Sequence, residues 1–123
     1  MIEETAEELS AALIAAPAIR AFLRTDGRGT LLSSTGLEPE AAAHLAERVD
    51  LAVAAATALG NGGRLGTPST LVFEFGESLL LAGVHSWGEH VVVVGAAGAN
   101  VGLVLSRLRR LLSRDAQDRE NRQ

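Results

Sequence analysis

Apolar and polar positions alternate between two spacings along the chain, and these spacings predict its first elements. Apolar residues three or four positions apart predict a helix from about Glu3 to Ala15, which Pro17 ends. From Ala18 to Thr25 the spacing changes to the alternation of a strand, and a second strand returns from about Thr30 to Ser34. Asp26-Gly27 between them is typical of a tight hairpin turn.

A long Ala-rich helix follows this hairpin. Pro39 suits the first turn of a helix, and Gly60 suits the position just past its end, so the helix is expected from Pro39 to about Leu59. Its small residues on the side away from the core would let another helix approach closely. The apolar stripe that we expect to face the core consists of Ala41, Leu45, Val49, Ala52, Ala56 and Leu59.

Three short strands and a last helix complete the pattern. The strands are expected at Ser69–Phe75, Ser78–Val84 and Glu89–Val94, and the apolar run in the third favours a central strand covered on both faces. Asn100 caps the helix, whose apolar stripe is Val101, Val104, Leu105, Leu108, Leu111 and Leu112. The sequence thus predicts one domain over residues 1–113 and a charged, disordered tail over 114–123.

Composition and charge narrow the class of protein. Hydrophobic residues make up 47% and charged residues 21% of 123 residues, which is the balance of one globular domain. The net charge of −4 gives no reason to expect nucleic acid as a partner. The acidic residues after Met1 do not fit a signal peptide, and no apolar run is long enough for membrane insertion, so we expect a cytoplasmic protein.

No segment carries the pattern of a catalytic, cofactor or metal site. The glycine-rich segment Gly60–Gly66 follows a helix and contains no Lys, so it does not fit a phosphate-binding P-loop. Gly95–Asn100 lies between a strand and a helix but lacks the glycine spacing of dinucleotide sites. We therefore expect no catalytic residues, no cofactor and no bound metal, the last also because the chain has no Cys.

The histidines and the single tryptophan leave alternatives open. His85 and His90 flank a turn and could face each other across it, but without a third ligand surface imidazoles are the better interpretation. Glu47 and Asp50 lie one turn apart on the long helix, where a solvated face is favoured over acid–base catalysis. Trp87 in the turn either shields a sheet edge or anchors a partner.

The order of elements resembles the roadblock (dynein light-chain-type) family over nearly all of Glu3 to Leu112. The most characteristic part is VVVVGAAGANVGLVLSRLRRLL from Val91 to Leu112, together with DGRGTLLSSTGLEPE from Asp26 to Glu40. The resemblance implies an α+β fold of order α-β-β-α-β-β-β-α. Its five-stranded antiparallel sheet would carry the long helix on one face and two helices on the other. Arg20 and Arg24 depart from the family pattern by making the first strand more charged.

The resemblance also implies a homodimer, in which two subunits pair their third strands and their long helices. The residues permit this arrangement independently. The third strand carries Leu71, Phe73 and Phe75 along one side, and an apolar edge strand of this kind is an aggregation risk unless it is paired. These three residues are therefore the expected dimer interface.

By resemblance, the expected function is regulation of a Ras-like small GTPase, either by promoting GTP hydrolysis or as a scaffold without effect on turnover. A small-molecule sensor is a third alternative, although the chain shows no sign of an internal pocket. Because no arginine except Arg48 lies on the exposed face of the long helix, a regulator of this kind would position the GTPase's own residues. The expected partner surface is that face, with Glu47, Asp50, Leu51, Ala54 and Ala58.

Overall fold

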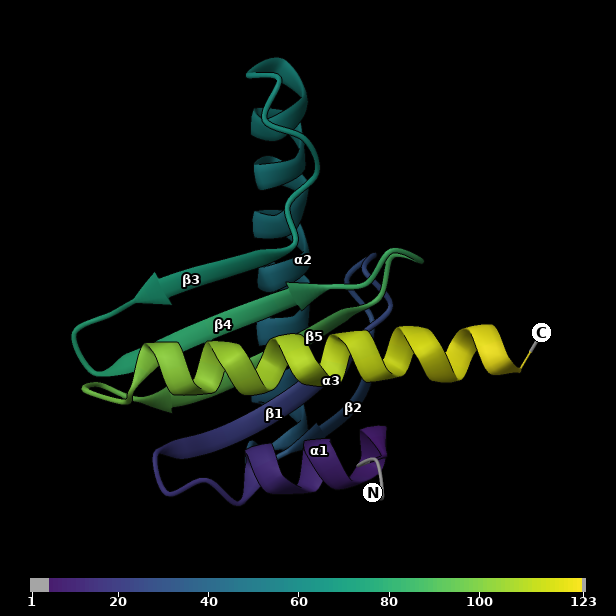
Figure 1. Cartoon of the computed structure of the whole chain (residues 1–123). Helices are drawn as coiled ribbons and strands as arrows, with labels where there is room; N and C mark the ends of the chain where they lie inside the picture. Colours follow the sequence, from purple (N-terminus) through teal and green to yellow (C-terminus); the bar gives the residue numbers. More distant parts are fainter. Residues whose placement is uncertain (1–4, 123) are drawn as a thin grey trace.

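Five antiparallel strands form one sheet that lies between two layers of helix (Figure 1). The structure is a computed structural model, and it describes residues 5–122. The elements, in chain order, are α1 (Ala6–Ile14), β1 (Ile19–Thr25), β2 (Leu31–Thr35), α2 (Pro39–Gly62), β3 (Thr70–Glu74), β4 (Ser78–Val84), β5 (His90–Ala96) and α3 (Val101–Asn121). The predicted order is confirmed, and Ile2 to Glu4 of the predicted first helix lie outside the described residues.

The strands are arranged in the order β2-β1-β5-β4-β3, so β5 is central and β2 and β3 are the edges. Val91, Val92 and Val93 of β5 are fully buried, because side chains that alternate between the two faces are covered on both. The apolar run in this strand therefore marks its central place, as predicted.

Each face of the sheet has its own hydrophobic core. On one face, α1 and α3 cover the side chains of Leu9, Leu13, Phe22, Leu79, Leu81, Val91, Val93, Val104, Leu108 and Leu111. On the other face, α2 covers Ala21, Leu23, Leu80, Ala82 and Val92 with its own Ala42, Val49 and Val53. The two-layer arrangement expected from the resemblance is confirmed.

Helix α3 begins where the sequence predicts. The side chain of Asn100 accepts a hydrogen bond of 3.0 Å from the N–H of Leu103, which is the contact of an N-terminal cap. Val104, Leu108 and Leu111 of the predicted stripe are buried. The helix packs so closely that a Cβ on Gly83 of β4 would lie 2.6 Å from Leu112, which explains a glycine inside this strand.

The buried face of α2 differs from the predicted one by a rotation of about one residue. Its buried residues are Ala42, Ala46, Val49, Asp50, Val53 and Gly60. Of the predicted stripe only Val49 is buried, and Ala41 and Leu59 are exposed. The prediction was wrong because so many positions are alanine that apolar spacing alone does not distinguish neighbouring faces.

The predicted disorder after Ser113 is also wrong for the described part of the tail. Helix α3 continues to Asn121, and the carboxylate of Asp115 lies 3.0 Å from the guanidinium of Arg24 on β1. The same contact explains a charged residue on this strand. No helix among residues 5–122 is long and apolar enough to cross a membrane.

Helix α2 extends past the sheet. In Figure 1 it crosses behind the strands at a steep angle, and its C-terminal half continues beyond β3. Its 24 residues span about 36 Å, whereas the outer strands of a five-stranded sheet are about 19 Å apart. The far end of α2 therefore extends past the β3 edge of the sheet, and no strand among residues 5–122 lies beneath it.

Candidate interaction surface on the long helix

The predicted partner surface contains a hollow between α2 and the β1–β2 turn. Its volume is about 330 Å³, and its lining is Gly27, Arg28, Gly29, Glu47, Asp50, Leu51 and Ala54. Four of the five predicted partner residues thus lie together, and Ala58 is exposed further along the helix. The turn residues were missed by the sequence analysis, because nothing in a local pattern indicates that this hairpin folds against α2.

Asp50 fastens the turn to the helix. Its Oδ2 accepts a hydrogen bond of 2.7 Å from the N–H of Gly29, and its Oδ1 accepts one of 2.7 Å from the hydroxyl of Thr25. Nδ1 of His90, at the start of β5, contacts the same Oδ1. Gly29 has a φ of +98°, a backbone conformation that favours glycine, and in it the N–H reaches the carboxylate.

The predicted position of Asp50 is wrong. It was expected on the exposed face beside Glu47, yet it is only 5% exposed. Because a buried carboxylate needs partners, the side that carries Asp50 turns toward Thr25 and His90. The sequence contains one signal for this buried face. Ala42, Val49 and Val53 recur at helical spacing, and the two valines are β-branched.

Leu51 remains a large apolar side chain in solvent, since 64% of it is exposed. Glu47 and Arg28 lie beside it at the rim of the hollow, with Ala54 one turn further along α2. The lining around Leu51 thus combines one basic residue, two acidic residues and several small residues. A surface of this composition suits a protein partner better than it suits a reacting group.

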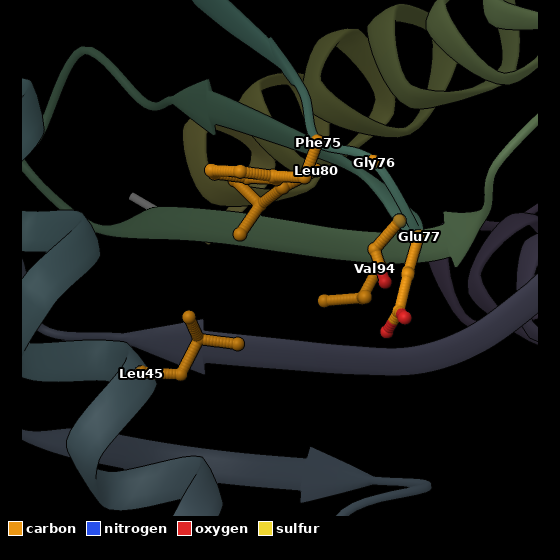
Figure 2. Close-up of a pocket in the computed structure, with 7 residues that line it drawn as sticks. Leu45, Phe75, Gly76, Glu77, Leu80 and Val94 are labelled. Carbon is orange, nitrogen blue, oxygen red and sulfur yellow. The ribbon is translucent and has the colours of Figure 1, made fainter.

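A second hollow lies on the α2 side of the sheet near β3. Figure 2 shows Leu45 of α2 opposite the turn at Phe75–Glu77, with Leu80 and Val94 between them. Its volume is about 520 Å³ and its lining is mainly apolar. Phe75 is 59% exposed and stacks on Phe73, with 6.3 Å between ring centroids.

The residues predicted for the dimer interface divide between core and surface. Leu71 and Phe73 pack at the margin of the α2-side core and are only partly covered, whereas Phe75 lies just past the end of β3. Val72, on the opposite side of the strand, is 40% exposed. Strand β3 therefore combines an open backbone edge with incompletely covered apolar side chains on both faces.

The histidines beside Trp87 point to opposite faces of the sheet. Nε2 of His85 lies 3.1 Å from Asp115 on α3, whereas His90 contacts Asp50 on α2. Both are at most 5% exposed, so the predictions of surface imidazoles and of a facing pair are wrong. In the part of the chain that the structure describes, no cluster of three or more potential ligands could hold a metal ion.

Trp87 lies between His85 and the end of α3. Its ring stacks on the imidazole of His85 at 3.9 Å, and the guanidinium of Arg119 lies over the ring at 4.6 Å.

Burial raises the pKa of Asp115. The His85 contact and the charge of Arg24 lower that pKa by more, so it lies below its ordinary 3.8. Asp115 is thus charged at neutral pH and attracts the side chains of Arg24 and His85.

Solved structures similar to this chain include MglB proteins and a Roadblock/LC7 domain. Myxococcus xanthus MglB has a TM-score of 0.81 and 21% identity, with 98% of this chain and 94% of that chain covered. A Roadblock/LC7 domain from Streptomyces avermitilis has a TM-score of 0.79 and 20% identity, covering 89% of this chain and 93% of its own. The gliding protein MglB from Thermus thermophilus has a TM-score of 0.77 and 22% identity, with coverage of 92% and 89%.

These comparisons establish that the chain has the roadblock fold over nearly its whole length. No family model and no curated protein matches the sequence. One further similar structure, with a TM-score of 0.77 and 22% identity, is described as MglB with tetrameric arrangement. At these identities the comparisons concern the fold, and the function is argued from the surfaces.

Proposed function

We propose that this protein is a homodimeric regulatory adaptor that binds a Ras-like small GTPase through the exposed face of α2. The observation that carries the proposal is Leu51, a largely exposed leucine at a hollow that Asp50 holds in shape. The roadblock fold, shared with the gliding protein MglB, supports a regulatory role rather than an enzymatic one.

The open edge of β3 supports the proposed dimer. A second copy related by two-fold symmetry would pair with the open edge of β3 and bring its own α2 beside the overhanging half of the first. The apolar hollow at Leu45 and Phe75, and the exposed Leu59, would then be covered. Leu71, Phe73 and Phe75 belong to this seam, and the two α2 helices together present one surface to the partner.

The GTPase surface consists of Glu47, Leu51, Ala54 and Ala58, with Arg28 added from the β1–β2 turn. Asp50 supports this surface from beneath and does not itself meet the partner. Arg48 and Arg28 are both exposed, and Arg28 lines the hollow beside Leu51. Because an exposed guanidinium is not held in one direction toward a phosphate, we expect promotion of GTP hydrolysis to act through the GTPase's own residues.

Leu51→Asp tests the surface. The variant should remain folded and dimeric, because Leu51 belongs to neither core, and should lose binding to the GTPase. The candidates are the Ras-like GTPases of the same genome, tested one at a time with bound GTP or GDP by calorimetry. Leu103→Asp, at an exposed leucine on α3, is the matched control and should bind as the wild type does.

The outcomes separate the alternatives. Undiminished binding by Leu51→Asp would refute the proposed surface, unfolding would place Leu51 in a core, and a monomer would place it in the dimer seam. Single-turnover GTP hydrolysis with and without the protein then distinguishes an activator from the second candidate, a scaffold. A scaffold would bind the GTPase and leave the hydrolysis rate unchanged.

A further inference from the structure

The last two turns of α3, residues Arg114 to Asn121, carry mostly polar and charged side chains; we refer to these turns as the strap. Ala116 is the only apolar residue in the strap, so hydrophobic burial contributes little to its position. Among the described residues, its side-chain contacts toward the sheet include those of Asp115 with Arg24 and His85 and that of Arg119 with Trp87.

Two hollows lie beside these contacts. One, of about 200 Å³, is lined by Ser86, Trp87, Ala116, Arg119 and Glu120. The other, of about 420 Å³, lies toward the start of β3 and includes Trp87 and Ala116 in its lining. The strap therefore contacts Trp87 and leaves unfilled space beside it.

Two buried ring nitrogens beside the strap lack an aligned hydrogen bond among the described residues. Nε1 of Trp87 is buried and has no hydrogen-bond partner among the described residues. Nε2 of His85 lies 3.1 Å from Asp115, but not in the geometry of an aligned hydrogen bond. When the strap opens, water reaches both nitrogens, which offsets the loss of the ion pairs.

We infer that the strap is a detachable cover over Trp87, held closed by Asp115 and opened without unfolding of the rest of the domain. Among the described residues, Asp115 contacts Arg24 of β1 and His85 of the β4–β5 turn, and the charged residues beside it along α3 include Arg114, Asp118 and Arg119. A partner or modification that neutralises Asp115 or occupies Arg24 would release the strap. Release would expose an aromatic ring of the kind enriched in binding hot spots.

Trp87 reports on the strap directly, because it is the only tryptophan in the chain. Asp115→Asn should shift its fluorescence emission to longer wavelengths and increase its quenching by acrylamide, with most far-UV circular dichroism retained. Asp118→Asn is the matched control, because Asp118 pairs with Arg114 within the same helix, and it should behave as the wild type does. Wild-type emission and quenching in Asp115→Asn would overturn the inference.

Hydrogen exchange on the wild-type chain gives a second test that does not depend on a variant folding. Amides of residues 115–121 should exchange together and faster than those of residues 104–112, because the strap opens as a unit below the free energy of global unfolding. Equal protection of the two halves of α3 would show that the strap opens only with the whole domain, and would refute the proposal.

Discussion

Asp50 connects three segments that are distant in sequence. Its carboxylate is bound by Gly29 and Thr25 of the first hairpin and by His90 of β5, which are 21, 25 and 40 residues away. A buried charge of this kind is tolerated only while its partners remain in place. The position of the β1–β2 turn, and with it the shape of the hollow at Leu51, therefore depends on one side chain.

Asp50→Ala should destabilise the protein by about 3–5 kcal/mol, because it removes the acceptor of two hydrogen bonds and leaves His90 buried without its carboxylate. Urea denaturation followed by circular dichroism measures this loss. Glu47→Ala, one turn away and exposed, is the control and should change the stability by no more than about 0.5 kcal/mol. Equal stabilities of the two variants would contradict the structural role of Asp50.

At the scale of elements, α2 and α3 each do more than cover the sheet. Helix α2 is longer than the sheet is wide, and its far half presents small side chains and Leu59 to solvent. Helix α3 continues past its apolar stripe into the strap, where ion pairs replace hydrophobic contacts. In both helices the segment that extends beyond the core leaves side chains available for interactions.

Deletion of the chain after Ser113 should lower the stability by about 1–3 kcal/mol, because Arg24 and buried His85 lose the charged partner that Asp115 provides. Urea denaturation is the measurement. A chain that ends at Glu120 retains both Asp115 and Arg119 and should be as stable as the full chain. If the chain that ends at Ser113 were as stable as the full chain, the strap contacts would contribute nothing, as expected of a disordered tail.

At the scale of the whole molecule, the sheet has two unequal edges. The β2 edge has exposed polar side chains and the exposed Leu32. The β3 edge has partly covered aromatic residues, an apolar hollow and the overhanging end of α2. A second copy would therefore bury more apolar surface at β3, which is the main favourable term in such an association.

Light scattering at low micromolar concentration should give twice the chain mass of 12.8 kDa, with an interface of about 1,600 Å² or more. Phe75→Glu places a charge in the proposed seam and should shift the mass toward a monomer. Leu32→Glu, at a similarly exposed residue on the opposite edge, should remain dimeric. A monomeric wild type would refute the dimer, and a dimer that only Leu32→Glu disrupts would place the seam at β2.

The sequence by itself determined the order of the elements and the limits of most of them. The apolar run of β5, the Asn100 cap and the stripe of α3 are local patterns that hold in any fold containing them. The Asp26-Gly27 turn is equally local, because its backbone conformation depends on adjacent residues.

Only the tertiary structure decided which way α2 faces, where the histidines point and how the chain ends. An alanine-rich helix has several nearly equivalent faces. The face that is buried carries Asp50, which pairs with the first hairpin and β5. Asp115 meets Arg24 across 91 residues, so nothing near the end of the chain predicts that its last turns bind the sheet. Contacts of this range arise only when the sheet has formed, since the strands bring their partners together.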